Sequence, residues 1–312
     1  MNVPDGGVDL RVGTSGWSYP SGPGGWRGIF YPAPGPGRRR VDELAYYAER
    51  FDTVEVNSTF YRTPSPETTR RWAARTPPGF DFSLKLYRKF THPDMYQQAT
   101  GRDPYDLGQA DIDEVRVALE PVARAGKLGM LLAQFPPAFH ASDVTRNYVA
   151  WLLRAFSDFT MAVELRHRSW SDAREATADL LAGHGAAWVQ IDEPKFRLSI
   201  RQDFRPNVPG AYYMRLHGRN AAAWWRHDEP ADRYDYLYSA AELEPVSRAV
   251  AEAARQARKL RVYLNNHFEA KAAANAVILK HQLGRPVEGA YERAFVERYP
   301  EVRGIVRTEG LF

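Results

Sequence analysis

Residues 10–17 read LRVGTSGW, a β-rich run that ends in Thr14, Ser15, Gly16 and Trp17. An open, doubly wound sheet that binds a dinucleotide usually carries the pattern G-x-G-x-x-G directly after its first strand. That pattern does not occur here, so the first strand favours a closed sheet over an open one. The choice then depends on how many further strands the chain supplies.

Seven more β-rich runs follow, and most intervals between them carry the apolar spacing of an amphipathic helix. The runs are DTVEVNST (52–59), FDFSLKLY (80–87), LGMLLAQF (128–135), MAVELRH (161–167), AAWVQID (186–192), YYMRLHG (212–218) and RVYLNN (261–266). Eight strands alternating with helices predict a TIM-type (β/α)₈ barrel, in a single domain over residues 1–312. Between the sixth and seventh strands, residues 193–210 contain three prolines and no helical pattern, so we expect an irregular crossover there.

The composition is that of a folded protein, because 44% of the 312 residues are hydrophobic and 26% are charged. The chain has no cysteine, which excludes disulfides, thiolate nucleophiles and Cys-ligated metal centres. A net charge of +4 does not by itself identify a nucleic-acid-binding protein. No stretch approaches about 18 consecutive apolar residues and the N-terminus lacks a signal-peptide pattern, so we expect a cytoplasmic protein without membrane association.

A set of polar side chains is predicted to face the barrel interior. Successive strand residues point to opposite faces of a sheet, and in the second run Glu55 and Asn57 share the inward parity while Val54 and Val56 share the outward one. The same pattern on the other strands gives inward polar residues near the C-terminal ends, where barrel active sites are built. The set contains Ser15, Trp17, Glu55, Asn57, Lys85, Gln134, Glu164, Arg166, Asp192, Arg215 and His217, with Asn265, Asn266 and His267 as candidates on the eighth strand, where the parity is ambiguous.

The inward charges balance, and this balance bears on the kind of site. Three carboxylates (Glu55, Glu164 and Asp192) stand against three cations (Lys85, Arg166 and Arg215), and we expect them to pair because an unpaired buried charge is costly. A metal cluster would need several carboxylates and histidines with few cations, so no metal site and no required cofactor is predicted; one divalent cation is the less favoured alternative. The cations are better suited to an anion such as phosphate.

Several motifs together resemble a known family. They are VGTSGWSY (12–19), WRGIFYP (26–32), the run from Glu43 to Pro77, LAQFPP (132–137), AVELRHRSW (162–170), YYMRLHG (212–218) and LNNHFEAKAAANA (264–276). In this order they closely resemble the YecE-like family, catalogued as domain-of-unknown-function family seventy-two, from about Leu10 to about Gln282. The resemblance implies a TIM-type barrel without an established reaction. It adds Tyr61 and His167 to the candidate residues, and it leaves residues 284–312 as a C-terminal extension.

The leading functional hypothesis is an enzyme that acts on a phosphorylated or nucleotide-like substrate, with phosphodiester hydrolysis as the leading reaction class. In it, Glu164 and His217 exchange protons, Glu55 and Asn57 orient the substrate or a water molecule, and Lys85, Arg166 and Arg215 hold the anion. Two alternatives stay open. One is a nucleic-acid-binding protein without catalysis, which uses the loops at the barrel mouth. The other is a sugar isomerase or hydrolase assisted by one divalent cation.

Overall fold

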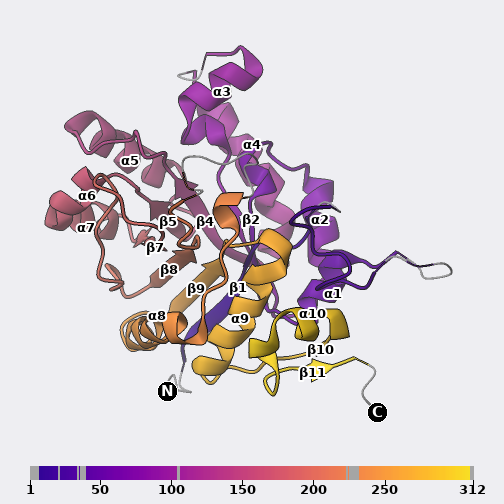
Figure 1. Ribbon diagram of the computed structural model, residues 1–312. Helices are drawn as coiled ribbons and strands as arrows, with labels where there is room; N and C mark the ends of the chain where they lie inside the picture. Colours follow the sequence, from indigo (N-terminus) through magenta and orange to yellow (C-terminus); the bar gives the residue numbers. More distant parts are fainter. Residues whose placement is uncertain are drawn as a thin grey trace.

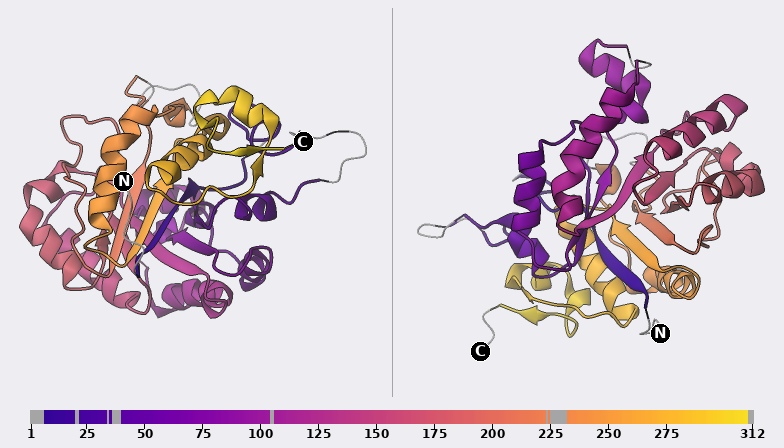
Figure 2. Two further views of the ribbon diagram at one scale, coloured as in Figure 1. Left: turned by 90° about the horizontal axis from the view of Figure 1, so that it is seen from below. Right: turned by 180° about the vertical axis from the view of Figure 1, so that it is seen from behind.

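The chain forms a barrel of parallel strands with helices on its outside, as Figures 1 and 2 show. This computed structural model describes residues 7–19, 22–33, 35, 40–103, 106–222, 224 and 232–309. Within them, an apolar core that includes Val54, Leu131 and Val262 is fully or almost fully buried. None of the described helices is long and apolar enough to cross a membrane.

All eight predicted strands are present, and every pair of neighbours is parallel. The sixth is divided into two, so the strands are labelled β1 (Asp9–Ser15), β2 (Thr53–Val56), β3 (Asp81–Lys85), β4 (Leu128–Gln134), β5 (Met161–Glu164), β6 (Ala187–Trp188), β7 (Gln190–Asp192), β8 (Ala211–Leu216) and β9 (Lys259–Leu264). The order is β6-β5-β4-β3-β2-β1-β9-β8-β7. Since β6 and β7 are two halves of one predicted strand, separated by Val189, the sheet returns to its starting point and the predicted TIM-type barrel is confirmed.

The helices cover the sheet, and several of them begin at a residue whose side chain caps the helix. The helices are α1 (Glu43–Ala48), α2 (Pro66–Ala74), α3 (Pro93–Thr100), α4 (Gln109–Arg124), α5 (Asp143–Ala155), α6 (Arg168–Asp172), α7 (Arg174–Ala182), α8 (Ala240–Ala253), α9 (Lys271–Gln282) and α10 (Arg293–Arg298). Ser65 caps α2 by accepting from the Thr68 N–H, and Ser239 forms a capping box with Glu242 at the start of α8. Residues 193–210 contain no helix, so the irregular crossover before β8 is confirmed.

Five short 3₁₀ helices and a small second sheet complete the described elements. The 3₁₀ helices are η1 (Ser58–Phe60), η2 (Arg88–Phe90), η3 (Asp232–Tyr234), η4 (Phe268–Ala270) and η5 (Pro300–Val302). The second sheet pairs β10 (Ala290–Tyr291) with β11 (Arg307–Thr308) in parallel. The region predicted as an extension packs on the barrel domain, because Arg50 Nε donates to the Ala290 carbonyl at 2.7 Å and the rings of Phe30 and Phe295 lie 5.7 Å apart.

Polar side chains fill the barrel interior at both ends. At the N-terminal end, Arg261 on β9 pairs with Asp81 on β3, and these two strands are not neighbours in the sheet. At the C-terminal end, Arg215 on β8 pairs in the same way with Glu55 on β2. Contacts between strands that do not neighbour each other must cross the interior. The C-terminal end is the mouth, and it holds the candidate site.

Candidate functional site

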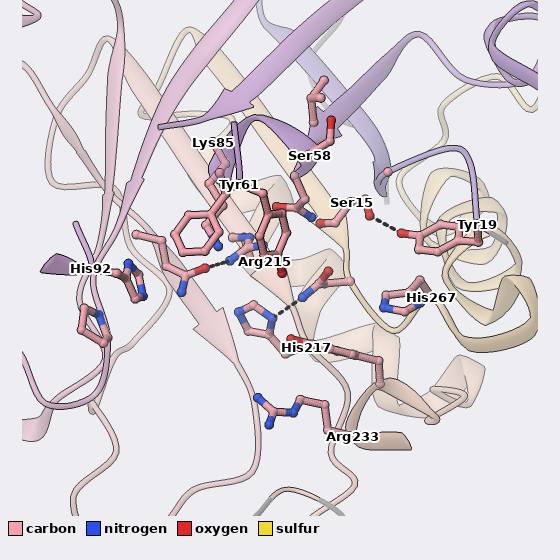
Figure 3. A pocket seen from close by; sticks show the side chains of 18 of the residues that line it. Ser15, Tyr19, Ser58, Tyr61, Lys85, His92, Arg215, His217, Arg233 and His267 are labelled. Carbon is pink, nitrogen blue, oxygen red and sulfur yellow. Dashed lines mark hydrogen bonds between the residues drawn. The ribbon is translucent and has the colours of Figure 1, made fainter. Parts of the chain in front are cut away.

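A cavity of about 590 Å³ opens at the mouth of the barrel, where the strands end. Figure 3 shows Lys85, Arg215 and His217, which come from β3, β8 and the residue after β8, directed into the same hollow. Eleven residues of the predicted set line this cavity: Ser15, Trp17, Asn57, Tyr61, Lys85, Gln134, Arg166, Arg215, His217, Asn265 and His267. The structure therefore brings together most of the residues that strand parity and family resemblance had indicated.

Beneath the cavity lies an ion cluster formed by Glu55, Glu164, Arg166 and Arg215. Both carboxylates are fully buried. Arg215 donates to Glu164 at 2.5 Å and to Glu55 at 2.7 Å, while Arg166 Nε donates to the other oxygen of Glu164 at 2.6 Å. The second oxygen of Glu55 accepts from the Tyr213 hydroxyl at 2.7 Å. All four carboxylate oxygens thus have donors, and the two negative charges balance the two positive ones.

The contacts of Glu164 differ from those expected of a group that exchanges protons near neutral pH. Burial raises the pKa of Glu164, but the guanidinium groups of Arg215 and Arg166 outweigh that effect and hold it well below the usual value. The side chain is therefore a carboxylate that fixes two arginines. Glu55, which holds the other side of Arg215, lies beside it below the cavity and not among the lining residues.

His217 is a neutral imidazole that positions Arg166. Burial, together with the charges of Arg166 and Arg215, lowers the pKa of His217 to about 3. Its Nε2 lies 2.9 Å from Arg166 Nη2, and its Nδ1 lies 2.9 Å from the side-chain amide of Asn265. A guanidinium only donates, so Nε2 must accept, Nδ1 carries the proton, and the oxygen of the Asn265 amide is the group that fits against it. Both ring nitrogens are thereby used within the protein.

Lys85 is not paired with a carboxylate, contrary to the prediction. The arginines and Tyr213 occupy every oxygen of Glu55 and Glu164. The Lys85 ammonium lies 3.9 Å from the centroid of the Phe60 ring, and it forms no ion pair within the described part of the chain. Burial and the charge of Arg215 lower the pKa of Lys85 to about 7. This amine therefore titrates near neutrality, inside the cavity.

Three buried polar atoms in the lining have no hydrogen-bond partner among the residues that the structure describes. They are Ser15 Oγ, Asn57 Oδ1 and Arg215 Nε. Buried polar groups are usually paired, because an unpaired one costs about 1–3 kcal/mol. Together they offer a hydroxyl that donates or accepts, an amide oxygen that accepts and a charged N–H that donates. A polar ligand with acidic oxygens and hydroxyl groups matches this pattern.

Five predicted site residues do not line the cavity. Glu55 and Glu164 belong to the ion cluster below it, and the other three are Asp192, Asn266 and His167. Asp192 accepts from Arg219 at 2.7 and 2.9 Å and from the Tyr238 hydroxyl at 2.7 Å, so it holds the loop that follows β8. Asn266 donates to the Tyr236 carbonyl and to Asn275, so its contacts anchor the same loop and α9. Strand parity does not extend into these strand ends and loops, where the backbone turns.

His167 is the third, and it serves as the N-cap of α6. Its Nδ1 accepts from the Ser169 N–H at 3.1 Å, and its ring lies 3.9 Å from that of His140. It lines a separate hollow of about 280 Å³, which shares Arg166 with the mouth cavity.

The cavity also contains aromatic and imidazole rings that strand parity did not identify as site residues. His267 stacks on Tyr19 at 4.4 Å and lies 4.9 Å from Tyr234, and all three rings line the cavity. Burial, together with the charges of Lys85 and Arg166, lowers the pKa of a further lining residue, His92, to about 3. Tyr19 and His267 both lie within the quoted motifs VGTSGWSY and LNNHFEAKAAANA, and His267 was a candidate on the eighth strand, where the parity was ambiguous. No local pattern marks His92 or Tyr234.

The described residues contain no group of three or more His, Cys, Asp or Glu side chains placed to hold a metal ion. Among the candidate carboxylates, Glu55, Glu164 and Asp192 all accept from arginines. The metal-assisted alternative therefore finds no ligand set in this part of the chain.

Comparisons with known proteins agree with the resemblance seen in the motifs. The model of the family described as "Protein of unknown function DUF72" matches residues 11–298, and thus extends beyond the expected limit near Gln282. The UPF0759 protein YunF of Bacillus subtilis is 28% identical over 273 residues, which cover 85% of this chain and 92% of YunF. The UPF0759 protein YecE of Escherichia coli is 28% identical over 158 residues, about half of each chain.

Two solved structures of DUF72 family proteins have the same fold. The protein from Thermotoga maritima is 33% identical, with a TM-score of 0.74, and the match covers 89% of this chain and all of the other. The protein from Enterococcus faecalis is 24% identical, with a TM-score of 0.75, and the match covers 88% of this chain and 95% of the other.

Proposed function

We propose that this chain, which belongs to the DUF72 family, is an enzyme that binds a small phosphorylated or nucleotide-like substrate in the cavity at the barrel mouth. Because the family is described without a reaction, the support comes from the cavity itself. The observation that carries the proposal is a set of three unpaired, buried polar atoms in the cavity lining. They are Ser15 Oγ, Asn57 Oδ1 and Arg215 Nε, the last of which belongs to the ion cluster. A ligand that supplies their partners removes the cost of leaving them unpaired.

The charges favour an anionic ligand. Within the ion cluster, Glu55 and Glu164 offset Arg166 and Arg215. A further buried carboxyl group, that of Glu193, lies 3.8 Å from Arg166, and burial raises its pKa. Lys85 adds positive charge whenever it is protonated, and it forms no ion pair within the described part of the chain. Burial, together with the charge of Arg215, lowers its pKa to about 7. A phosphate group bound at Arg166 and the free Nε of Arg215 would supply the negative charge that compensates a protonated Lys85. It would also accept charge-assisted hydrogen bonds, which are about twice as strong as neutral ones.

The remaining lining suits the sugar and base parts of such a substrate. Ser15 and Asn57 offer partners for hydroxyl groups, and the rings of Trp17 and Tyr61 lie at the rim. The Tyr61 side chain is 61% exposed, which is unusual for so large a ring and suits a face that stacks on a ligand. The volume of about 590 Å³ lies in the range of small-molecule sites.

Hydrolysis of a phosphoester is the reaction class that we propose, with roles that follow the contacts. Glu164 and Glu55 hold Arg215 in place, and His217 holds Arg166, so the arginines are oriented before a substrate binds. Lys85, whose pKa is about 7, takes the role of proton acceptor that Glu164 and His217 had in the sequence-based hypothesis.

A binding experiment with a matched pair of variants tests the proposal. Inorganic phosphate, nucleoside monophosphates and sugar phosphates are titrated by calorimetry into the wild-type protein, Arg166→Gln and Arg168→Gln. Arg168 is a half-exposed arginine two residues along the chain that pairs with Asp172. We expect Arg166→Gln to lose roughly tenfold or more in affinity and Arg168→Gln to bind like the wild type, since a hydrogen bond to a charged group contributes about 1.5–3 kcal/mol.

Equal affinity in both variants, or no binding of any phosphorylated compound, would overturn the proposal. Binding of single-stranded DNA or RNA that weakens steeply with salt, without binding of the small phosphates, would favour the nucleic-acid-binding alternative. A phosphoesterase screen then tests the reaction class. We expect Lys85→Arg to lose the activity and Lys89→Arg, in the 3₁₀ helix η2 that follows β3 and paired with Asp111, to keep it.

A further inference from the structure

We propose that Lys85 is a nucleophile that condenses with an aldehyde or ketone carbonyl of the substrate, so that the substrate class is a small phosphorylated carbonyl compound. The carbonyl chemistry stands on the surroundings of Lys85, while the phosphate part of the substrate rests on the proposed function above. The inference goes beyond the proposed function, because a Lys85 bound as an imine cannot also accept a proton in phosphoester hydrolysis. The covalent step replaces that role of the amine and keeps the proposed anion site.

Lys85 differs from the other lysines in its contacts. The chain has seven lysines: Lys85, Lys89, Lys127, Lys195, Lys259, Lys271 and Lys280. Five of them donate a hydrogen bond to a carbonyl or carboxylate oxygen, namely Lys89, Lys127, Lys195, Lys259 and Lys271. Lys85 and Lys280 have no such partner among the described residues. Of the seven, Lys85 alone lines the mouth cavity.

The ion cluster explains why Lys85 is left without a partner. Arg166, Arg215 and Tyr213 occupy the four oxygens of Glu55 and Glu164, so no carboxylate oxygen remains for the amine. The cluster is neutral, and a protonated Lys85 would add a third positive charge beside two buried guanidinium groups. In a low-dielectric site this repulsion favours the neutral amine, which is the form that attacks carbonyl carbons. The lowered pKa of Lys85, about 7, agrees with this reasoning.

The surroundings also suit the product of the condensation. The neutral Lys85 Nζ attacks the carbonyl carbon, the C–N bond forms, and the carbonyl oxygen takes up the proton that the nitrogen loses. The hydroxyl of the resulting carbinolamine takes up one further proton from solvent and leaves as water, which gives a protonated imine. One amine, one carbonyl and one proton thus give one iminium cation and one water, without oxidation or reduction. The iminium cation would lie against the face of the Phe60 ring, whose centroid is 3.9 Å from Nζ.

The two functional ends of the proposed substrate fit different parts of the cavity. Arg166 and the free Nε of Arg215 would hold the phosphate, while Lys85 reaches the same hollow from β3 on another side of the barrel. Figure 3 shows Lys85 and Arg215 approaching each other from opposite strands.

Reductive trapping tests the inference directly. The wild-type protein is incubated at pH 7 with sodium cyanoborohydride and glyceraldehyde 3-phosphate or ribose 5-phosphate, and the adduct is located by peptide mass mapping. An ordinary lysine with a pKa near 10.4 is neutral in roughly one molecule in 2,500 at pH 7, whereas an amine with a pKa of about 7 is neutral in about half. We expect Lys85 to be labelled up to roughly a thousandfold faster than the exposed lysines.

Matched variants serve as controls. Lys85→Arg and Lys85→Met should abolish the selective adduct, and Lys280→Met should retain it, since Lys280 is also a buried lysine with a lowered pKa but lies outside the cavity. Peptide mapping of the wild type needs no variant, so the test holds even if Lys85→Met does not fold. Labelling spread evenly over the lysines, or a Lys85 that stays unlabelled by every aldehyde, would overturn the inference.

The failure of this inference can be told apart from failure of the proposed function. If phosphorylated compounds bind and depend on Arg166 but no adduct forms at Lys85, the imine step is rejected and the anion site stands. If Lys85 is trapped equally by glyceraldehyde and by its 3-phosphate, the nucleophile is supported and the phosphate site is rejected.

Discussion

Each end of the barrel interior holds a buried arginine between two carboxylates, but among the described residues only one of the two networks has a partner for every polar atom. At the N-terminal end, Arg261 lies between Asp81 and Asp9, and at the mouth Arg215 lies between Glu55 and Glu164. Both arginines are at most 1% exposed, and both join strands that are not all neighbours in the sheet. Sequence parity makes these two arrangements look equivalent.

They differ in how many of the polar atoms have partners. Every nitrogen of the Arg261 guanidinium donates a hydrogen bond, to Asp81, to Asp9 or to the Leu260 carbonyl. The Ser83 hydroxyl at the same end accepts from Tyr263 and from a backbone N–H. At the mouth, Arg215 Nε and Ser15 Oγ have no partner in the described part of the chain. A complete network stabilises the barrel, whereas an incomplete one that lines a cavity is arranged for a ligand.

The largest expected effect is that of Glu164→Gln at the mouth. The change removes the carboxylate that both Arg166 and Arg215 contact, and it leaves buried positive charge without compensation. We expect a loss of about 3 kcal/mol in the free energy of unfolding, measured by urea denaturation, together with weaker phosphate binding. An unchanged or raised stability would mean that the carboxylate is held for function and not to compensate the arginines.

The corresponding change at the other end, Asp81→Asn, should separate stability from binding. Arg261 keeps Asp9 as a second partner, so the loss should be smaller, about 2 kcal/mol, by the same urea measurement. Phosphate affinity should stay at the wild-type value because Asp81 lies at the opposite end of the barrel. A loss of affinity as large as that in Glu164→Gln would remove the distinction between the two ends.

Lys85→Met should raise the free energy of unfolding near neutral pH, whereas the two carboxylate substitutions lower it. The folded-state pKa of Lys85 is lowered to about 7, so between about pH 7 and pH 10.4 the unfolded chain binds a proton that the folded chain lacks. The free energy of unfolding therefore rises with pH across that window. At and below pH 7 this gain is absent. Burial is the largest cause of this lowered pKa; the charges of Arg215 and Arg166 lower it further, while those of Glu164 and Glu55 raise it.

Removal of the amine should therefore stabilise the protein at pH 7 by about 1 kcal/mol, and this gain should fade above pH 10. Thermal or urea unfolding of the variant and the wild type at several pH values provides the measurement. A variant that is less stable than the wild type at pH 7 would show that the ammonium is well compensated, and it would count against a neutral amine.

The smallest expected effect comes from a pair of serines, Ser15 at the mouth and Ser83 at the other end. Ser83→Ala removes a hydroxyl with two hydrogen bonds and should cost about 1 kcal/mol. Ser15→Ala removes a hydroxyl without a partner and should leave stability within about 0.5 kcal/mol while it lowers ligand affinity. Equal destabilisation by the two changes would mean that Ser15 is as fully paired as Ser83.

Much of the site followed from strand parity, and the exceptions share a cause. Glu55, Lys85, Glu164 and Arg215 lie within regular strands, where alternation determines the direction of each side chain. Asp192 and Asn266 lie at or beyond strand ends, and they contact loop residues instead of the cavity. The break at Val189, just before Asp192, also could not be predicted, because it arises from the match between β6 and β5 on one side and β7 and β8 on the other.

The sequence by itself determined the eight strands, their order along the chain, the irregular crossover and the polar interior, because period and parity are local properties of the backbone. Only the tertiary structure decided which charges meet. Glu55 and Arg215 are 160 residues apart, and their pairing depends on the curvature that brings β2 and β8 face to face across the barrel. In that geometry Arg166, Arg215 and Tyr213 donate to all four oxygens of Glu55 and Glu164. In the part of the chain that the structure describes, Lys85 is left without a partner because each carboxylate has only two oxygens.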